Sequence, residues 1–347
     1  MKLSVVRTVP AWNDLAREWN DLLAGSVARV PFLRHEYLTN WWAYLGAPGE
    51  WPHGELHIVT ARIDGELAAV APLFASVNHD SEPVLALIGS DELSDYLDLI
   101  ARPEHLAEFV AAMLEHLDSP EAPAWRSLDL YNLRDDSPTL PALEASAAAR
   151  GWSCRRERII DYSTASLAGG WEGYQSRLDK KQRHEFRRKM RRAEEAGNTR
   201  WSIVADRARL EEAADDLLRL MAFRADKATL FAPPVCQQLR GLLYAAFDAG
   251  WLQLARLVIA GQPAAAFLNF DYDGRIWVYN CGLDPAFREL SPGIVLLGHL
   301  IQWAADNGRS AVDFLRGEEA YKRHFGAVAR PLWCITIERP ALIHQAT

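Results

Sequence analysis

Hydrophobic and polar positions along the first half of the chain follow a regular succession of strand and helix patterns. The N-terminal run KLSVVR has strand character, and the Asp64–Gly65 pair between two apolar runs is a strong signal of a tight hairpin. Pro103 suits the first turn of the helix PEHLAEFVAAMLEHL. The pattern predicts a strand at 2–7, helices at 11–24 and 34–45, hairpin strands within 56–74, apolar segments at 83–88 and 96–100, a helix at 103–117, a strand at 127–133, a helix at 139–150 and a strand at 153–162.

The second half repeats this order of elements. Its clearest part is LQLARLVIAGQPAAAFLNFDYDGRIWVYNCGL, which predicts three antiparallel strands with turns at Gly261–Gln262 and Asp273–Gly274. The remaining expected elements are a strand at 201–205, helices at 207–220 and 234–249, a helix at 292–307, a strand at 311–315, a short helix at 317–325 and a strand at 332–338.

Both halves therefore contain a strand, two helices, a β meander, a helix, a strand, a helix and a strand. We expect two related α/β (α+β) domains, residues 1–162 and 163–347, each with a mixed, mostly antiparallel sheet flanked by helices. Ligands tend to bind where the order or direction of a sheet changes, with helix N-termini facing them. We therefore expect a ligand site between Leu283 and Gly293.

Composition restricts the class of protein. A chain of 347 residues with 49% hydrophobic and 24% charged residues is typical of two globular domains. The formal net charge of −8 argues against a surface wholly committed to nucleic acid. Four widely separated cysteines form no CxxC pair, so we expect no metal site and no disulfide framework.

No stretch of the chain approaches the apolar length that a membrane span requires. The N-terminal residues MKLSVVRTVPAWNDL also lack the apolar run of a signal peptide. The sequence thus predicts a cytoplasmic protein without a membrane span.

The segment CGLDPAFRELSPGIVLLGHLIQWA carries the main candidate site. Ser291 suits the N-cap of the following helix, Pro292 suits its first position, and Gly293 lets a ligand approach the backbone. Unpaired amides and the positive end of the helix dipole favour a pyrophosphate there. An ordinary capped helix explains the same residues without any ligand.

The run Arg288 to Gly293, RELSPG, resembles the coenzyme A loop of the GNAT acyltransferase superfamily, Q/R-x-x-G-x-G/A, with Ser291 in place of the middle glycine. The segment VDFLRGEEAYKRHFGA, residues 312–327, resembles the C-terminal signature of CelD/BcsL-type acetyltransferases. That branch has two tandem GNAT-like domains and is associated with exopolysaccharide and cellulose synthesis. PFLRHEYLTNWWAYLG and SDYLDLI are similar to the same branch.

The resemblance implies an acyl-CoA cosubstrate and a set of donor-binding residues in the C-terminal half. In GNAT chemistry an amine attacks a thioester, and backbone amides hold the acyl carbonyl. The strand 275–282 is the expected source of these amides at its C-terminal end. The expected cofactor-binding residues are Asn280, Gly282, Leu283, Arg288, Ser291, Gly293, Ile294 and Val295.

The resemblance also implies catalytic residues after the last predicted apolar strand. Tyr321, in AYKRHFG, resembles the tyrosine that protonates the departing thiolate in the superfamily, and a packing role is the alternative. Asp313 in a central strand is either a general base or an ion-pair partner of Arg316 or Lys322, because a lone buried carboxylate is costly. Glu318 lies one helical turn before Tyr321 and Lys322 and is expected to orient either residue or to stabilise the helix start.

A basic run, RLDKKQRHEFRRKMRR, occupies residues 177–192. Leu178, Gln182, Phe186 and Met190 recur every four residues, which predicts one amphipathic helix over about 172–196. Its positive faces suit an anionic partner such as tRNA, a coenzyme phosphate or an anionic glycan. A solvated helix that links the two halves explains the same pattern.

Three functions remain open. The first is transfer of an acyl group, expected to be acetyl, from acyl-CoA to an amine or a hydroxyl of a small-molecule or glycan acceptor, in polysaccharide or cell-envelope metabolism. The tandem FemABX-type transferases share the architecture, so transfer from aminoacyl-tRNA is the second. The third is a non-catalytic binding protein. We expect the N-terminal half to be a scaffold or acceptor wall, with Arg316, Tyr37 and Trp41 as candidate substrate-binding residues.

Overall fold

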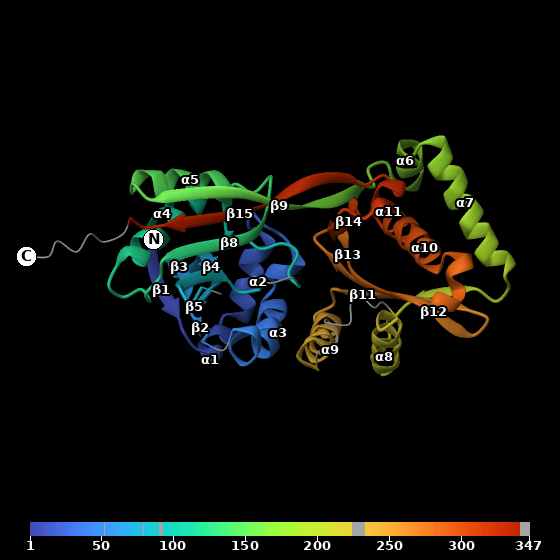
Figure 1. Ribbon diagram of the computed structural model, residues 1–347, viewed down its shortest axis with the longest axis horizontal. Coiled ribbons are helices and arrows are strands. Elements are labelled where there is room, and N and C mark those ends of the chain that lie inside the picture. Colours follow the sequence, from blue (N-terminus) through green and yellow to red (C-terminus); the bar gives the residue numbers. More distant parts are fainter. Residues whose placement is uncertain (52, 79, 90–92, 224–232, 341–347) are drawn as a thin grey trace, which may run out of the picture. The chain divides into compact units, whose positions relative to one another are not determined.

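The computed structural model describes residues 1–51, 53–78, 80–89, 93–223 and 233–340 (Figure 1). Its contacts divide the chain into two compact units. Unit 1 contains Met1–Ile160 and the chain from Pro331 onward, and unit 2 contains Asp161–Arg330. None of the helices in the described ranges is long and apolar enough to cross a membrane.

Unit 1 contains a four-stranded sheet, β1-β3-β4-β7, and the hydrogen-bonded strands β9-β15-β8-β6-β5-β2 of an eleven-stranded sheet, in which β15 is Val328–Glu338. Asp64 and Gly65 both have positive φ, so the expected hairpin between β3 and β4 is confirmed. Its elements are β1 Lys2–Val6, α1 Val9–Asn13, α2 Ala16–Ala24, α3 His35–Leu45, β2 Glu55–Leu56, β3 Ile58–Ile63, β4 Glu66–Ala71, β5 Leu73–Val77, β6 Pro83–Leu87, β7 Ile100–Ala101, α4 Leu106–Asp118, β8 Ser127–Arg134, α5 Thr139–Ala149 and the first part of β9 Ser153–Ser166.

Two expectations for unit 1 need correction. The helix expected at 11–24 is two helices, separated at Asp14 and Leu15. The apolar segment 96–100 has strand geometry only at its last residue, although its side chains are buried. Helix α4 shows why the rest of the pattern is informative, because its buried residues recur at helical spacing: Leu106, Phe109, Val110, Met113, Leu114 and Leu117.

The strands of unit 2 are hydrogen-bonded in the order β10-β11-β12-β13-β14-β9 and belong to the eleven-stranded sheet. Helices α8 and α9 cover one face of strands β11 to β13, and α10 covers the other (Figure 1). Its elements are α6 Gly170–Arg177, α7 Lys180–Glu195, β10 Arg200–Ile203, α8 Leu210–Met221, α9 Pro233–Asp248, β11 Leu252–Ile259, β12 Gln262–Tyr272, β13 Arg275–Leu283, the 3-10 helix η6 Pro285–Leu290, α10 Pro292–Asp306, β14 Ala311–Arg316, α11 Ala320–His324 and the start of β15 Val328–Glu338.

The turns of the meander agree with the sequence to within one residue. Asp273 and Gly274 have positive φ and connect β12 to β13 as expected. The preceding turn uses Ala260 and Gly261, both with positive φ, and therefore lies one residue before the expected Gly261–Gln262 pair. Gln262 is instead the first residue of β12.

The last strand of each half pairs in a way that the repeated order does not predict. Residues Tyr162–Ser166 of β9, which follow the elements of the first half, pair with β14 in unit 2. Residues Leu332–Glu338 of β15, which end the second half, pair with β8 in unit 1. The assignment of all of 163–347 to one domain is therefore wrong for this strand, because the two halves exchange their final strands.

Candidate functional site

The parallel strands β13 and β14 separate in the middle of unit 2. They pair only through Arg275–Ala311, Ile276–Val312 and Trp277–Asp313. Both strands continue past this ladder, β13 to Leu283 and β14 to Arg316, and the connection between them carries α10. This opening beside a helix N-terminus is the kind of place where α/β proteins bind ligands.

A bulge lies in β13 beyond the point of separation. The pairing with β12 changes from Asn269–Val278 to Leu268–Asn280, so Tyr279 is an extra residue. A bulge bends the strand and turns its backbone groups in a new direction. The Oδ1 of Asn280 accepts a hydrogen bond of 3.0 Å from the amide of Cys281, so this side chain fixes the backbone next to the bulge.

Two glycines of the predicted donor site have clear packing roles. A Cβ on Gly282 would lie 2.5 Å from Cβ of Leu220 and from the amide nitrogen of Met221, so only glycine lets α8 approach β13 this closely. A Cβ on Gly293 would lie 3.1 Å from both Cδ atoms of Leu283. The end of β13 and the start of α10 are therefore in contact, as the predicted site requires.

Ser291 precedes α10 in a different conformation from the expected cap. It has φ 53° and ψ 52°, and its side chain makes no capping hydrogen bond. Its carbonyl accepts a hydrogen bond of 3.1 Å from the amide of Val295, so that amide is already used. Pro292 has no N–H to donate. The first turn therefore offers the amides of Gly293 and Ile294 to a ligand, with the positive end of the helix dipole.

Helix α7 brings basic residues to the same end of α10. A Cβ on Gly298 of α10 would lie 2.3 Å from Cε2 of Phe186 and 3.2 Å from Sδ of Met190, which confirms the predicted apolar face. At the C-terminal end of α7, Nη2 of Arg192 lies 4.0 Å from Oε2 of Glu289, which precedes α10. The side chain of Arg288 is 82% exposed beside it. Ion pairs this exposed are weak, so both guanidinium groups are available to a phosphate.

The basic segment is not one helix. It breaks between α6 and α7, where Asp179 and Gln182 form a capping box. The sequence contains the signal for this break, because Asp179 precedes Gln182 by three residues.

Asp313 is fully buried in β14 and holds a kink in that strand. Its Oδ1 accepts the amide of Leu315 at 2.9 Å, and its Oδ2 accepts Oγ1 of Thr164 at 3.1 Å. Leu315 has φ 59°, and the pairing of β14 with β9 shifts register at this point. The carboxylate thus stabilises the left-handed backbone conformation of Leu315, which residues with β-branched or bulky side chains rarely adopt.

Lys322 is 2% exposed and closes the end of β14. Its Nζ donates to the carbonyls of Leu315, Arg316 and Gly317 at 3.2, 2.7 and 3.1 Å. It also lies 2.9 Å from Oε2 of Glu319. The expectation that Glu318 orients Lys322 needs correction, since Glu318 is exposed and precedes the helix, whereas Glu319 is the N-cap residue that contacts the lysine.

Tyr321 is half-buried on α11, where its ring packs edge-on against Phe314 with centroids 6.3 Å apart. Phe314 belongs to β14, which diverges from β13, and Arg316 is half-buried at the end of the same strand. The structure therefore gathers Asp313, Arg316, Tyr321 and Lys322 around one strand end. Tyr37 and Trp41, the other predicted substrate-binding residues, lie in unit 1 and are not part of this group.

Tyr37 and Trp41 are 0% exposed in the core of unit 1. The hydroxyl of Tyr37 donates to the carbonyl of Leu93 at 2.9 Å, and the ring of Trp41 packs near Phe74. Neither ring has a surface on which a sugar could stack. Their assignment as substrate-binding residues is therefore wrong, and helical core packing explains their spacing.

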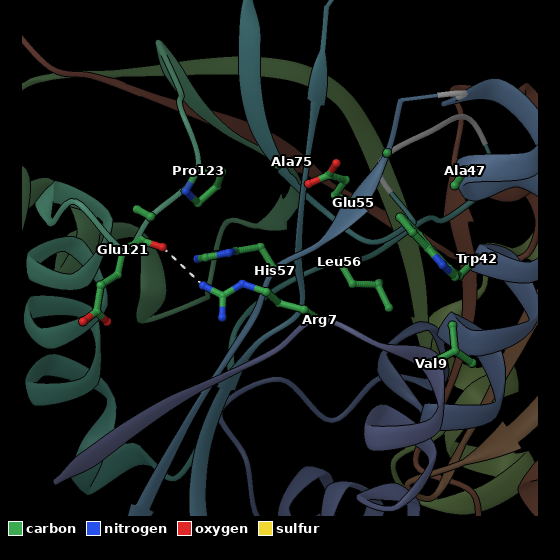
Figure 2. A pocket seen from close by; sticks show the side chains of 12 residues that line it. Arg7, Val9, Trp42, Ala47, Glu55, Leu56, His57, Ala75, Glu121 and Pro123 are labelled. Atoms are coloured by element: carbon green, nitrogen blue, oxygen red, sulfur yellow. Dashed lines mark hydrogen bonds between the residues drawn. The ribbon is translucent and has the colours of Figure 1, made fainter.

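Unit 1 contains a cavity of about 540 Å³ that is lined in part by Arg7 and His57 (Figure 2). No pattern in the sequence predicts this cavity. Across the described residues, no group of three or more histidine, cysteine or acidic side chains is arranged to hold a metal ion.

Residues 180–323 match the family described as Acetyltransferase (GNAT) domain, a segment that contains β13, α10 and β14. Comparison with curated protein sequences gives no match.

Several solved structures share the fold. The crystal structure of FemX is 10% identical with a TM-score of 0.67, over 96% of this chain and 97% of that one. A conserved protein of unknown function from Bacteroides thetaiotaomicron is 11% identical with a TM-score of 0.64, over 97% and 100%. The C-terminal domain of a putative lysylphosphatidylglycerol synthetase from Agrobacterium fabrum is 12% identical with a TM-score of 0.58, over 95% and 93%.

Proposed function

Because the chain has a GNAT superfamily fold related to that of FemX, with a GNAT domain at 180–323, we propose that it is an acyltransferase with its donor site between β13 and β14. The separation of these strands after Trp277 and Asp313, beside the N-terminus of α10, is the observation that carries the proposal. The acyl carbonyl would lie against the backbone of the bulged end of β13, around Asn280 to Leu283. The phosphates of the donor would lie at Gly293 and Ile294.

The reaction joins a neutral amine to the acyl carbon of a thioester. The carbon–sulfur bond breaks, the nitrogen loses one proton, and the departing sulfur gains one. We assign the phenol of Tyr321 as the proton donor to the sulfur, because it lies next to Phe314 on the diverging strand; the proton released by the nitrogen then restores the phenol. Both oxygens of Asp313 already accept hydrogen bonds, so we assign Asp313 as a positioning residue rather than a base.

Acyl-CoA is the donor that we favour. A coenzyme A diphosphate needs a small number of amides and nearby cations, and Gly293, Ile294, Arg192 and Arg288 supply them. The acceptor would be an amine or a hydroxyl of a small molecule or glycan, in polysaccharide or cell-envelope metabolism, and a cytoplasmic location suits a coenzyme A donor.

Transfer from aminoacyl-tRNA is the second candidate. The observation that favours it is the exposed basic surface of α7, where Lys180 and Lys181 are exposed and Arg191 and Arg192 extend it to the start of α10. A track of positive charge longer than a coenzyme A molecule requires is typical of nucleic-acid binding.

Calorimetric titration with acetyl-CoA tests the donor. We expect saturable binding that weakens at least about tenfold in Gly293→Val, whose side chain would meet Leu283 at the end of β13, and in Arg192→Gln, which removes a charge-assisted contact. Arg207→Gln is the matched control, because Arg207 is an exposed arginine of unit 2 that pairs with Asp248.

Absence of heat at millimolar acetyl-CoA would contradict the coenzyme A donor. Retention of aminoacyl-tRNA at moderate salt, reduced by Lys181→Gln, would then favour the second candidate. If neither donor binds, both transferase proposals fail, which leaves the non-catalytic binding protein as the third candidate.

A further inference from the structure

A cavity of about 540 Å³ opens in unit 1, and its wall has a cationic end and an apolar end (Figure 2). Its volume lies within the range of small-molecule sites, roughly 300 to 1,000 Å³. Every residue of this wall precedes residue 124, so the cavity lies outside the matched GNAT segment 180–323. A ligand in this cavity would therefore bind independently of the proposed transfer reaction.

The cationic end is formed by Arg7, and His57 lies beside it. Arg7 follows β1, and one of its N–H groups donates to the backbone carbonyl of Glu121 at 3.2 Å. Among the described residues, no carboxylate forms an ion pair with Arg7, and Figure 2 shows the carboxylate of Glu121 turned away from it. Most of the guanidinium donors are therefore available to a ligand.

His57 is held rigidly beside Arg7. It is 2% exposed, and its Nε2 lies 3.1 Å from Nε2 of His116, with the two rings stacked at an interplanar angle of 12°. Burial, with the nearby charges of His116 and Arg7, lowers the pKa of His57 to about 4. The ring is therefore neutral at pH 7 and fixed in orientation, with one nitrogen engaged by His116.

The apolar end lies away from Glu121, where Trp42, Ala47 and Val9 come together (Figure 2). The indole of Trp42 is 7% exposed and is held by Phe74, with ring centroids 5.6 Å apart. Val9 is 41% exposed, so its apolar surface is accessible to a ligand. An unpaired guanidinium at one end and apolar surface at the other define an amphipathic ligand.

We propose that this cavity binds a small monocarboxylate with an apolar or aryl body. The carboxylate would bind the guanidinium of Arg7, whose planar fork matches two carboxylate oxygens, with His57 beside it. The body of the ligand would lie against Trp42 and Val9. Glu55 also lines the wall, and because its repulsion grows with the charge of an anion, it disfavours a doubly charged phosphate more than a monocarboxylate.

Calorimetry on the full-length protein at pH 7 tests the proposal with three molecules that share a phenyl ring on a three-carbon chain: 3-phenylpropanoate, 3-phenylpropanamide and 3-phenylpropylamine. We expect 3-phenylpropanoate to bind at least about tenfold more tightly than the amide or the amine. Arg7→Gln should weaken its binding by at least about tenfold, because it removes the charge. Arg17→Gln, which alters an arginine side chain that is 95% exposed in the same unit, should leave the affinity unchanged.

A second variant locates the ligand. Ala75 lines the cavity and is half-buried, so Ala75→Leu should fill space and abolish binding while Arg7 remains in place. Equal affinity of wild type and Ala75→Leu would overturn the proposal, as would no heat from 3-phenylpropanoate at 20-fold excess over roughly millimolar protein. Tighter binding of the amine would also overturn it and would assign the charge recognition to Glu55.

Discussion

Tyr321 is the residue whose chemistry is most open to a direct test. We expect Tyr321→Phe to lower kcat by about 10²- to 10⁴-fold, because the variant keeps the ring packed on Phe314 and removes only the phenol proton. The affinity for acetyl-CoA measured by calorimetry should stay within about twofold. Wild-type turnover in the variant would make the tyrosine a packing residue.

His57 gives a residue-scale prediction about pH. Its pKa in the folded protein is lowered to about 4, first by burial and then by the charges of His116 and Arg7. An unfolded histidine titrates near its ordinary pKa of about 6.5. The unfolded chain therefore binds the extra proton between these values, and the free energy of unfolding should fall as pH decreases through this window, by at most about 1.4 kcal/mol per pH unit.

Urea denaturation between pH 7 and pH 5 measures this dependence. We expect His57→Gln to flatten the decline relative to wild type, since the substituted residue cannot titrate. His53→Gln is the control, because His53 is exposed in the same segment. A decline that is equally steep in wild type and His57→Gln would contradict the assignment.

At the scale of elements, one ammonium group joins the end of β14 to the start of α11. Lys322→Met should lower the free energy of unfolding by about 2 to 4 kcal/mol, because three carbonyls from residues 315–317 lose a charged donor at a buried site. Glu319→Gln should cost less than about 1 kcal/mol, because the Glu319 side chain is 55% exposed. Equal effects of the two substitutions in urea denaturation would show that the carbonyl contacts are not stabilising.

At the scale of the whole molecule, the exchanged strands determine which fragments fold. Residues 1–162 alone lack β15, which lies between β9 and β8 in the sheet of unit 1. That fragment exposes an unpaired strand edge and loses the buried side chains of Leu332, Ile335 and Ile337.

We therefore expect the fragment 1–162 to show no cooperative unfolding transition when urea denaturation is followed by circular dichroism. Joining residues 331–340 to it through a flexible Gly/Ser linker should restore a cooperative transition, because the missing strand is again available. The same linker followed by the ten residues in scrambled order is the control. A cooperative transition in 1–162 alone would mean that unit 1 does not depend on β15.

The amino-acid sequence by itself determined the features that depend on neighbouring residues. Hydrophobic spacing located most helices and strands, and Asp64–Gly65 and Asp273–Gly274 located two hairpins, because positive φ at a two-residue turn strongly favours such pairs. The resemblance of residues 288–293 and 312–327 to GNAT motifs led to the segment that the family match covers.

Only the tertiary structure decided the features that depend on residues distant in sequence. The bulge at Tyr279 has no glycine or proline to mark it, and the left-handed Leu315 relies on a buried aspartate. The burial of Tyr37 and Trp41 and the choice of Glu319 over Glu318 depend on how helices meet their neighbours. The partner of β15 is likewise set by which sheet edge it reaches, since an apolar strand can pair with any edge that buries the same face.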